Sequence, residues 1–457
     1  MIIASASRLC KSHLQLSFDA TLAARGVPEG CRYIMPGMTT PHSSTAQSRV
    51  SDVCIVGNGA IAKTAALGFA QAGHSVTLLV PAPRLAAEEA APSFAPGTER
   101  PWDVRVYALN HTAHDLLSAL KVWDAMDAAR IAPVDAMAVN GDGKEGGDAG
   151  GKPGGKLGFD AFGAHTGALA WIVEDSNLNQ ALDAALKFAH NVQVVSGSAS
   201  RLTCGPEGAQ VELEDGRRLD AKLVVGADGR DSWVRGQCDI GIDYRSYHQR
   251  AIVTNFACEK PHHGVAHQWF TCKDGIVALL PLPGNKVSLV WSAPETLAAT
   301  LMEESLGELA IRLCEYADEP LGALKPLQPE AVKAVPLALV RPHALVAPHV
   351  ALVGDAAHAV HPLAGHGMNL GFGDVVDLLR VIGEREEHRA VGDERVLARY
   401  ARARKEDVLL MQLATDGLER LFGANLEPVR VMRNLGLDLL DKLPFVKRRL
   451  MAHAIGK

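Results

Sequence analysis

Two patterns of hydrophobic and polar positions follow each other along the chain. In the first, short continuous apolar runs at residues 53–56 and 75–80 flank a glycine-rich turn and an alanine-rich stretch with helical spacing. A continuous apolar run of this length is typical of a parallel strand that is buried on both faces. The pattern therefore predicts a strand–turn–helix–strand unit with a right-handed connection, and residues 350–353 predict another buried strand.

The second pattern is an alternation of apolar and polar residues. Over residues 192–225 it predicts a hairpin that turns at Asp215 and Gly216. Over residues 245–291, four β-rich runs predict a separate antiparallel sheet with one covered face. The glycine- and lysine-rich stretch 141–158 predicts a flexible loop, because its composition cannot build a core. Helical spacing predicts helices over residues 177–190, 298–316, 369–379 and most of the chain after 374.

The composition is that of a globular enzyme-sized protein. Its 457 residues suffice for two or three domains, and no apolar run is long enough to cross a bilayer. The net charge of -6 gives no general electrostatic case for nucleic acid binding. The eight cysteines are scattered without a C-x-x-C pair, which argues against a disulfide framework or a zinc site and favours a reducing compartment such as the cytoplasm. Residues 1–50 are expected to be a disordered or mis-annotated extension, with Met35 or Met38 as the initiator; a transit peptide is the alternative.

The first candidate motif is the turn "GNGAIA". Gly57 permits a tight turn, Gly59 lets a diphosphate approach the backbone, and the small Ala62 allows the helix to pack on the strand. The free N–H groups of the helix N-terminus attract an anion. The acid that would bind a ribose hydroxyl at the end of the second strand is absent, because Val80 occupies that place.

Two further motifs add polar groups to strands or strand ends. Arg105 in "DVRVYALN" is expected on an apolar strand, where its guanidinium needs an anion. That anion is either a ligand or an ordinary partner such as Asp103 or Glu174. In "GADGRDSWVR" an apolar strand ends, and a turn at Asp228 and Gly229 is expected to present its backbone to a cofactor.

The fourth motif is "GDAAHAVHPLAGHGMNLG". Gly354 and Asp355 leave a buried strand, and the carboxylate can accept hydrogen bonds from hydroxyl or amide groups. Pro362 stiffens the following loop, while Gly365 and Gly367 allow a flat ring to lie against the backbone. The helix after them points its N-terminus at that ring, which stabilises negative charge there.

These four motifs, in this order, resemble the class A FAD-dependent aromatic hydroxylases. The signature "HPLAGQGxNLG" of the ubiquinone-biosynthesis branch is nearly reproduced, and "WIVED", "GVAHQWF", "IVALLPLP" and "SLVWS" are also similar to that branch. The similarity runs from about residue 52 to the C-terminus. His366 departs from the pattern, because the family has glutamine there.

The resemblance implies an FAD-dependent monooxygenase that uses NADH or NADPH as reductant. In that family a flavin C4a-hydroperoxide transfers oxygen to a phenolic ring, here the aromatic ring of a polyprenylated phenol in ubiquinone biosynthesis. The flavin carries the chemistry, so no catalytic side chain is expected. The expected cofactor-binding residues are Gly57, Gly59, Ala62, Arg105, Asp228, Gly354, Asp355, Pro362, Gly365, His366, Gly367 and Asn369.

The implied fold is α/β, with a Rossmann-like FAD-binding domain and an interleaved β-sheet substrate domain. Its FAD-binding domain is expected to comprise residues 51–135, 165–235 and 340–385. The substrate domain is expected over residues 236–339 and the C-terminal helices over residues 386–457.

Two alternative functions stay open at this point. Val80 and His366 also fit a flavin-poor scaffold in a ubiquinone-biosynthesis complex, and a third hypothesis is an FAD monooxygenase of a soluble aromatic compound. The basic C-terminal segment is expected either to pack on the FAD domain or to contact the inner membrane or a biosynthetic complex. His262, His263 and His267 are expected to be exposed or packed histidines rather than metal ligands.

Overall fold

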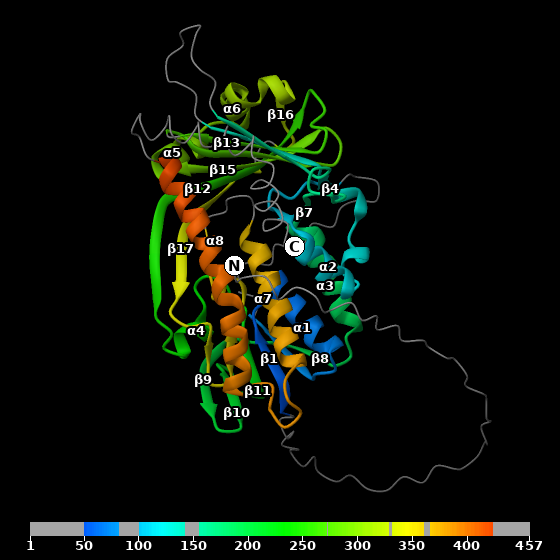
Figure 1. The fold of residues 1–457 in the computed structure, drawn as a ribbon, viewed down its shortest axis with the longest axis vertical. Coiled ribbons are helices and arrows are strands. Elements are labelled where there is room, and N and C mark those ends of the chain that lie inside the picture. The colour runs from blue at the N-terminus through cyan, green and yellow to red at the C-terminus, as the bar shows by residue number, and fades with distance from the viewer. Residues whose placement is uncertain are drawn as a thin grey trace, which may run out of the picture. The chain divides into compact units, whose positions relative to one another are not determined.

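A computed structural model gives the architecture of the chain (Figure 1). It describes residues 50–81, 100–141, 155–271, 273–328, 331–360 and 366–423. All of them belong to one unit, Ser48–Lys457. The expected N-terminal extension, the loop with Pro362 and Gly365, and the basic C-terminal segment lie outside the described residues.

The first sheet contains the predicted buried strands. Its order is β18-β19-β11-β1-β2-β8, and β9 and β10 extend it through an antiparallel hairpin with β11. The pairs β1–β2, β1–β11, β2–β8 and β11–β19 are parallel. The hairpin turns at Asp215 and Gly216, as predicted. The strands are β1 (Ser51–Val56), β2 (Val76–Val80), β8 (Val192–Ser196), β9 (Ala199–Gly205), β10 (Gly208–Leu213), β11 (Arg218–Gly226), β18 (Val346–Ala347) and β19 (Val350–Leu352).

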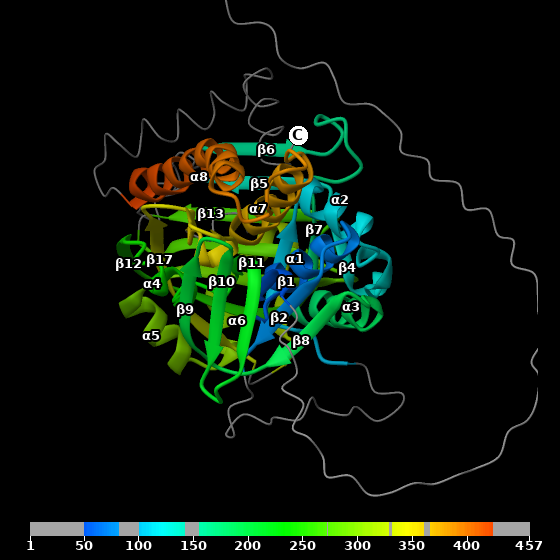
Figure 2. The same cartoon turned by 90° about the horizontal axis from the view of Figure 1, so that it is seen from below.

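Helices cover one face of this sheet, as Figure 2 shows. Val53 and Ile55 of β1 are fully buried there, against Phe69 of α1, Leu378 of α7 and Tyr400 of α8. The opposite face packs against the β9–β10 hairpin and α4. The helices are α1 (Ala60–Gln71), α4 (Trp233–Gln237), α7 (His366–Gly383) and α8 (Glu394–Gly423). No described helix is long and apolar enough to cross a membrane.

The second sheet has the order β16-β12-β15-β14-β13-β5-β6, and β17 also pairs with β12. Helices α5 and α6 cover one face around Trp291 and Phe256. The elements are β5 (Ala136–Asn140), β6 (Lys156–Asp160), β12 (Ile242–Cys258), β13 (Val265–Thr271), β14 (Gly275–Leu282), β15 (Lys286–Pro294), α5 (Glu295–Glu303), α6 (Leu306–Leu321), β16 (Leu324–Pro326) and β17 (Lys333–Pro342).

The boundaries of this sheet differ from the expected range 236–339. It also takes β5 and β6 from before residue 165, and β5 pairs in parallel with β13. The end of the stretch 141–158 is therefore strand rather than loop. Leu157 explains the difference, because it is buried in an apolar cluster with Phe270 and Ile276 of the sheet.

A third, three-stranded sheet has the order β3-β7-β4 and packs against helices on one face and against the second sheet on the other. Neighbouring residues of β7 face opposite sides, as the strand period requires. Val173 packs with α2, α3 and α7, whereas Ile172 packs with Leu282 of the second sheet. Its elements are β3 (Val106–Leu109), α2 (His111–Ala119), η1 (Trp123–Ala125), η2 (Ala128–Arg130), β4 (Ile131–Val134), β7 (Ala170–Glu174) and α3 (Asp175–Phe188).

Candidate functional site

Three turns meet at the carboxyl ends of adjacent parallel strands. Val56 of β1 is paired with Gly226 of β11, and Gly226 is paired with Leu352 of β19. The turns after these residues contain the first, third and fourth sequence motifs. The carboxyl edge of a parallel sheet is where such folds bind ligands, so the register brings the three motifs to one candidate site.

The first turn is close to its neighbours on one side and open on the other. Gly57 has a φ of +141°, and a Cβ atom there would lie 2.3 Å from the carbonyl oxygen of Ala227 and 3.3 Å from Cβ of Ala62. Gly59 is the N-cap of α1 without a side-chain hydrogen bond, and a Cβ on it would meet nothing within 4 Å. The N-terminus of α1 is therefore a backbone surface that an anion can approach.

The fourth motif places a carboxylate beside this surface. Gly354, with a φ of +62°, packs on Ile61 of α1 and turns the chain after β19. The Asp355 side chain reaches the solvent, but the surrounding protein removes enough water to raise the pKa of its carboxyl above its ordinary value. Electrostatic interactions with His358, Arg105 and Arg230 lower the pKa of the same carboxyl and so oppose that rise. Residues of the second, third and fourth motifs thus share one electrostatic environment.

Arg105 does not lie on a strand, contrary to the expectation. It is exposed and precedes β3 by one residue, because its N–H donates to Oδ1 of Asp103 at 3.0 Å rather than to the sheet. Glu174 is not its partner either, because that carboxylate binds Arg130. Among the described contacts, the guanidinium of Arg105 lies 5.7 Å from the ring of Tyr107.

Two other expected site residues use their side chains within the protein. Asp228 accepts hydrogen bonds from the hydroxyl of Ser232 and the N–H of Val234, and so caps α4. Asn369 donates to the carbonyl of Ala108 and accepts from the N–H of Asn110, which ties α7 to the start of α2. Both residues can offer a ligand their backbone rather than their side chains.

The end of the fourth motif is described only in part. His366 begins α7, and its side chain lies outside the described residues. Gly367 is half-buried, and a Cβ on it would meet nothing within 4 Å.

Of the three histidines considered as metal ligands, His262 stabilises a turn. His262 contacts the carbonyl oxygens of Leu282 and Gly284 through Nε2, and its Nδ1 accepts the N–H of Gly264. Within the described ranges, no three His, Cys, Asp or Glu side chains are grouped so as to hold a metal ion.

A buried ionic group beneath the Asp355 turn was not predicted from the sequence. Asp374 of α7 accepts hydrogen bonds from the N–H of Gly354 at 2.8 Å, from Nε2 of His358 at 2.7 Å and from Nε of Arg404 at 2.7 Å. Burial alone would raise the pKa of Asp374, but these three partners hold it below its ordinary value. The signal was present, because Asp374 is a charged residue inside an apolar stretch of a helix.

The comparisons with known proteins agree with this geometry. The FAD binding domain family matches residues 175–411. The chain is 36% identical to the 3-demethoxyubiquinol 3-hydroxylase of Escherichia coli (strain K12), over 89% of this chain and 98% of that protein. It is 32% identical to the ubiquinone hydroxylase UbiL of Rhodospirillum rubrum, over 92% of this chain and 93% of that protein.

A solved structure shares the fold. PqsL of Pseudomonas aeruginosa, a probable FAD-dependent monooxygenase, superposes with a TM-score of 0.66 at 21% identity, over 85% of this chain and all of that one. The family match, the two relatives and the order of the four motifs lead to the same assignment. The chain belongs to the family of FAD-dependent monooxygenases that includes the ubiquinone-biosynthesis hydroxylases.

Proposed function

We propose that this protein hydroxylates the aromatic ring of a polyprenylated phenol in ubiquinone biosynthesis, with FAD, O2 and NADH or NADPH. The observation that carries the proposal is the meeting of three turns at the carboxyl edge of β1, β11 and β19, beside the uncapped N-terminus of α1. An aromatic hydroxylase needs such a surface to hold its flavin in place, because the cofactor performs the oxidation.

The residues of this edge fit FAD. Gly59, Gly229 and Gly367 each have open space where a side chain would lie, so a ligand can approach their backbones. The N-terminus of α1 would bind the diphosphate, and Arg105 would add a positive charge along the FAD chain. Asp355 would accept hydrogen bonds from the ribityl hydroxyls, and residues 362–367 would flank the isoalloxazine ring.

FAD bound here supplies the redox chemistry that inserts one oxygen atom into the ring. The protein binds and orients the substrate, excludes water and adjusts the electrostatics around the flavin. The N-terminus of α7 directs a partial positive charge towards the proposed ring site, which stabilises negative charge on a bound group.

The names of the relatives support the substrate class, because both act on ubiquinone or its precursors by name. We assign the substrate to the second sheet, which includes β5 and β6 in addition to the strands of the expected range 236–339. A polyprenyl chain partitions into lipid, so the proposal includes peripheral contact with a membrane or with a biosynthetic complex.

A comparison of two matched substrates tests this proposal. The full-length protein is incubated with NADH or NADPH and either a polyprenylated phenol or the same phenol without its prenyl chain, and products are measured by mass spectrometry. We expect a hydroxylated product from the prenylated phenol and little from the other. Equal turnover of both would favour a soluble aromatic substrate instead, and a protein without flavin absorbance would favour the scaffold.

A further inference from the structure

A buried ion pair lies beside the segment that carries Arg105. Glu174 is the last residue of β7, and its side chain is fully buried, while the side chain of Arg130 at the end of η2 is 12% exposed. Nε and Nη2 of Arg130 donate to the two carboxylate oxygens of Glu174 at 2.5 and 2.8 Å. A buried pair in this two-bond geometry is a strong and directional contact.

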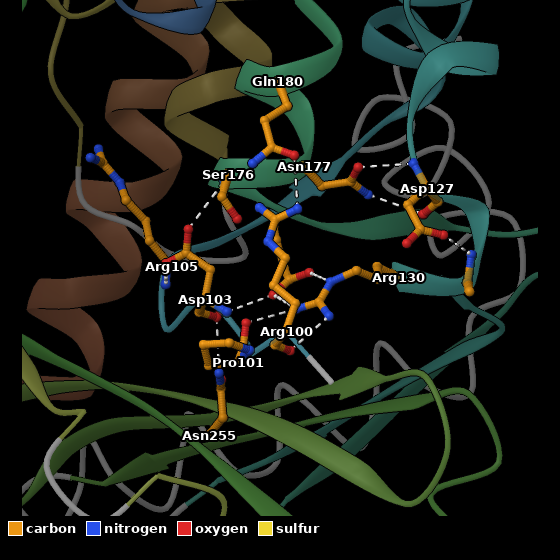
Figure 3. Close-up of polar contacts among 12 residues, drawn as sticks. Arg100, Pro101, Asp103, Arg105, Asp127, Arg130, Ser176, Asn177, Gln180 and Asn255 are labelled. Carbon is orange, nitrogen blue, oxygen red and sulfur yellow. Dashed lines mark hydrogen bonds and ion pairs between the residues drawn. The ribbon is translucent and has the colours of Figure 1, made fainter. Parts of the chain in front are cut away.

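The remaining donors of Arg130 bind the chain that precedes Arg105. Nη1 donates to the carbonyl of Arg100 and Nη2 also donates to the carbonyl of Pro101, as Figure 3 shows. The guanidinium lies 4.2 Å from the ring of Trp102. Arg130 therefore holds three consecutive residues, 100–102, against the end of β7.

Asp103 extends this network to Arg105. Its N–H donates to Oε1 of Glu174, and its own carboxylate accepts the N–H of Arg105 at 3.0 Å and the N–H of Ser176 at 3.1 Å. On the other side, the carbonyl of Arg105 accepts the N–H of Asp175 at 2.9 Å. The backbone of Arg105 is thus held from both sides while its side chain stays exposed.

The side chain of Arg105 is free of this network. In Figure 3 it points away from the contacts between Asp103 and Arg130, and its charge acts on Asp355 in the candidate site. A flexible arginine loses binding energy when its side chain must be ordered, and an anchored backbone reduces that loss.

We propose that Glu174, Arg130 and Asp103 are positioning residues, which hold Arg105 so that its guanidinium binds an anionic part of FAD. This inference rests on the proposed function. It deepens that function, because it makes cofactor affinity depend on an ion pair that has no ligand contact of its own.

Glu174→Gln disturbs this ion pair with little change in side-chain volume. Glutamine has the same shape as glutamate, but its amide NH2 would face N–H donors of Arg130 or Asp103. The buried guanidinium of Arg130 would also lose its counter-charge. A charge-assisted hydrogen bond to a ligand corresponds to about 10- to 100-fold in affinity. We expect Arg105→Ala to weaken FAD binding within that range, and Glu174→Gln to weaken it about tenfold.

The test is a double-mutant cycle on the full-length protein, read out as the FAD dissociation constant by flavin fluorescence. Glu174→Gln is introduced alone and together with Arg105→Ala. Asp103→Asn serves as a second variant if Glu174→Gln does not fold. Asp127→Asn is the matched control, because Asp127 caps η2 nearby and contacts neither Asp103 nor Arg105.

If Arg105 is the group being positioned, Glu174→Gln changes FAD affinity less than about twofold once Arg105 is alanine, and the control changes nothing. Riboflavin, which lacks the phosphates, keeps its affinity in the single variants. Additive losses, or an equal loss of riboflavin affinity, would overturn the positioning role. If Arg105→Ala alone leaves FAD affinity unchanged, the placement of Arg105 in the proposed function fails as well.

Discussion

Replacing Asp374 with asparagine removes the charge at the centre of the buried network beneath the Asp355 turn. The carboxylate accepts three hydrogen bonds, and both Asp374 and His358 have fully buried side chains. The side chain of Arg404 is 4% exposed. Asparagine keeps the shape but offers one acceptor oxygen, so its NH2 group must face at least one of the three donors.

The expected cost follows from these contacts. Breaking a buried pair by removing one charge costs about 3–5 kcal/mol of stability, because the remaining charge stays buried. Arg404 retains bonds to Asp377 and Asp407, which lie nearer to the solvent, so we expect the lower end, about 3 kcal/mol. For a chain of this length that corresponds to a decrease in the melting temperature of about 3 °C.

The assay is thermal unfolding of the flavin-free full-length protein, with Asp407→Asn as the matched control. Asp407 binds the same guanidinium, but its side chain is 54% exposed. The control is therefore expected to cost less than about 1 kcal/mol. Equal melting temperatures for wild type and Asp374→Asn would refute the reasoning.

The lowered pKa of Asp374 adds a dependence on pH with a defined sign. A carboxyl whose pKa is depressed by folding stabilises the folded state above its unfolded pKa, and this contribution is lost as the pH falls through the folded value. The difference in the free energy of unfolding between wild type and Asp374→Asn is therefore expected to be largest at neutral pH. It should become smaller as the pH falls below the ordinary carboxyl pKa of 3.8. A difference that grows in acid would contradict this assignment.

Three further predictions follow from single residues. Gly57→Ala should lower the melting temperature, because its Cβ would lie 2.3 Å from a carbonyl oxygen. Gly59→Ala should leave the melting temperature nearly unchanged and weaken FAD binding, because its Cβ would meet nothing within 4 Å. Equal decreases in melting temperature for the two variants would contradict this difference in packing. Asp52 pairs with Lys222, and the pKa of its carboxyl is lowered from 3.8 to about 2. Asp52→Asn should therefore remove a small stabilisation of less than about 1 kcal/mol. The wild type should lose the same stabilisation only as the pH falls from 3.8 to about 2. Val80→Glu should tighten FAD binding about tenfold in a fluorescence titration if β2 ends beside the ribose, and unchanged affinity would place the ribose elsewhere.

Local pattern was sufficient to predict the parallel core and its turns. The continuous apolar runs of β1 and β2 have no polar alternation, and Gly57 and Gly354 adopt positive φ values that favour glycine. Asp215 and Gly216 similarly predicted a hairpin that the structure contains. These features depend on residues close in sequence, so the sequence alone predicts them.

Contacts between distant residues were not predictable in the same way. β5 and β13 pair although more than a hundred residues separate them, and the glycine-rich composition near β6 hid its strand. Arg105 was expected on a strand because its neighbours are apolar, but Asp103 takes its N–H. The choice of Arg130 as the partner of Glu174 depends on tertiary neighbours that no local pattern shows.

The most direct test of the account is oxygen incorporation by the purified full-length protein. It is incubated with FAD, NADH or NADPH and a polyprenylated phenol under isotopically labelled oxygen gas, and the product is examined by mass spectrometry. We predict one labelled oxygen atom on the aromatic ring, formed only with reductant, and a strongly reduced yield of this product in Asp355→Ala. Flavin-loaded protein that oxidises the reductant without labelling any phenol, or a product whose new oxygen comes from water, would contradict it.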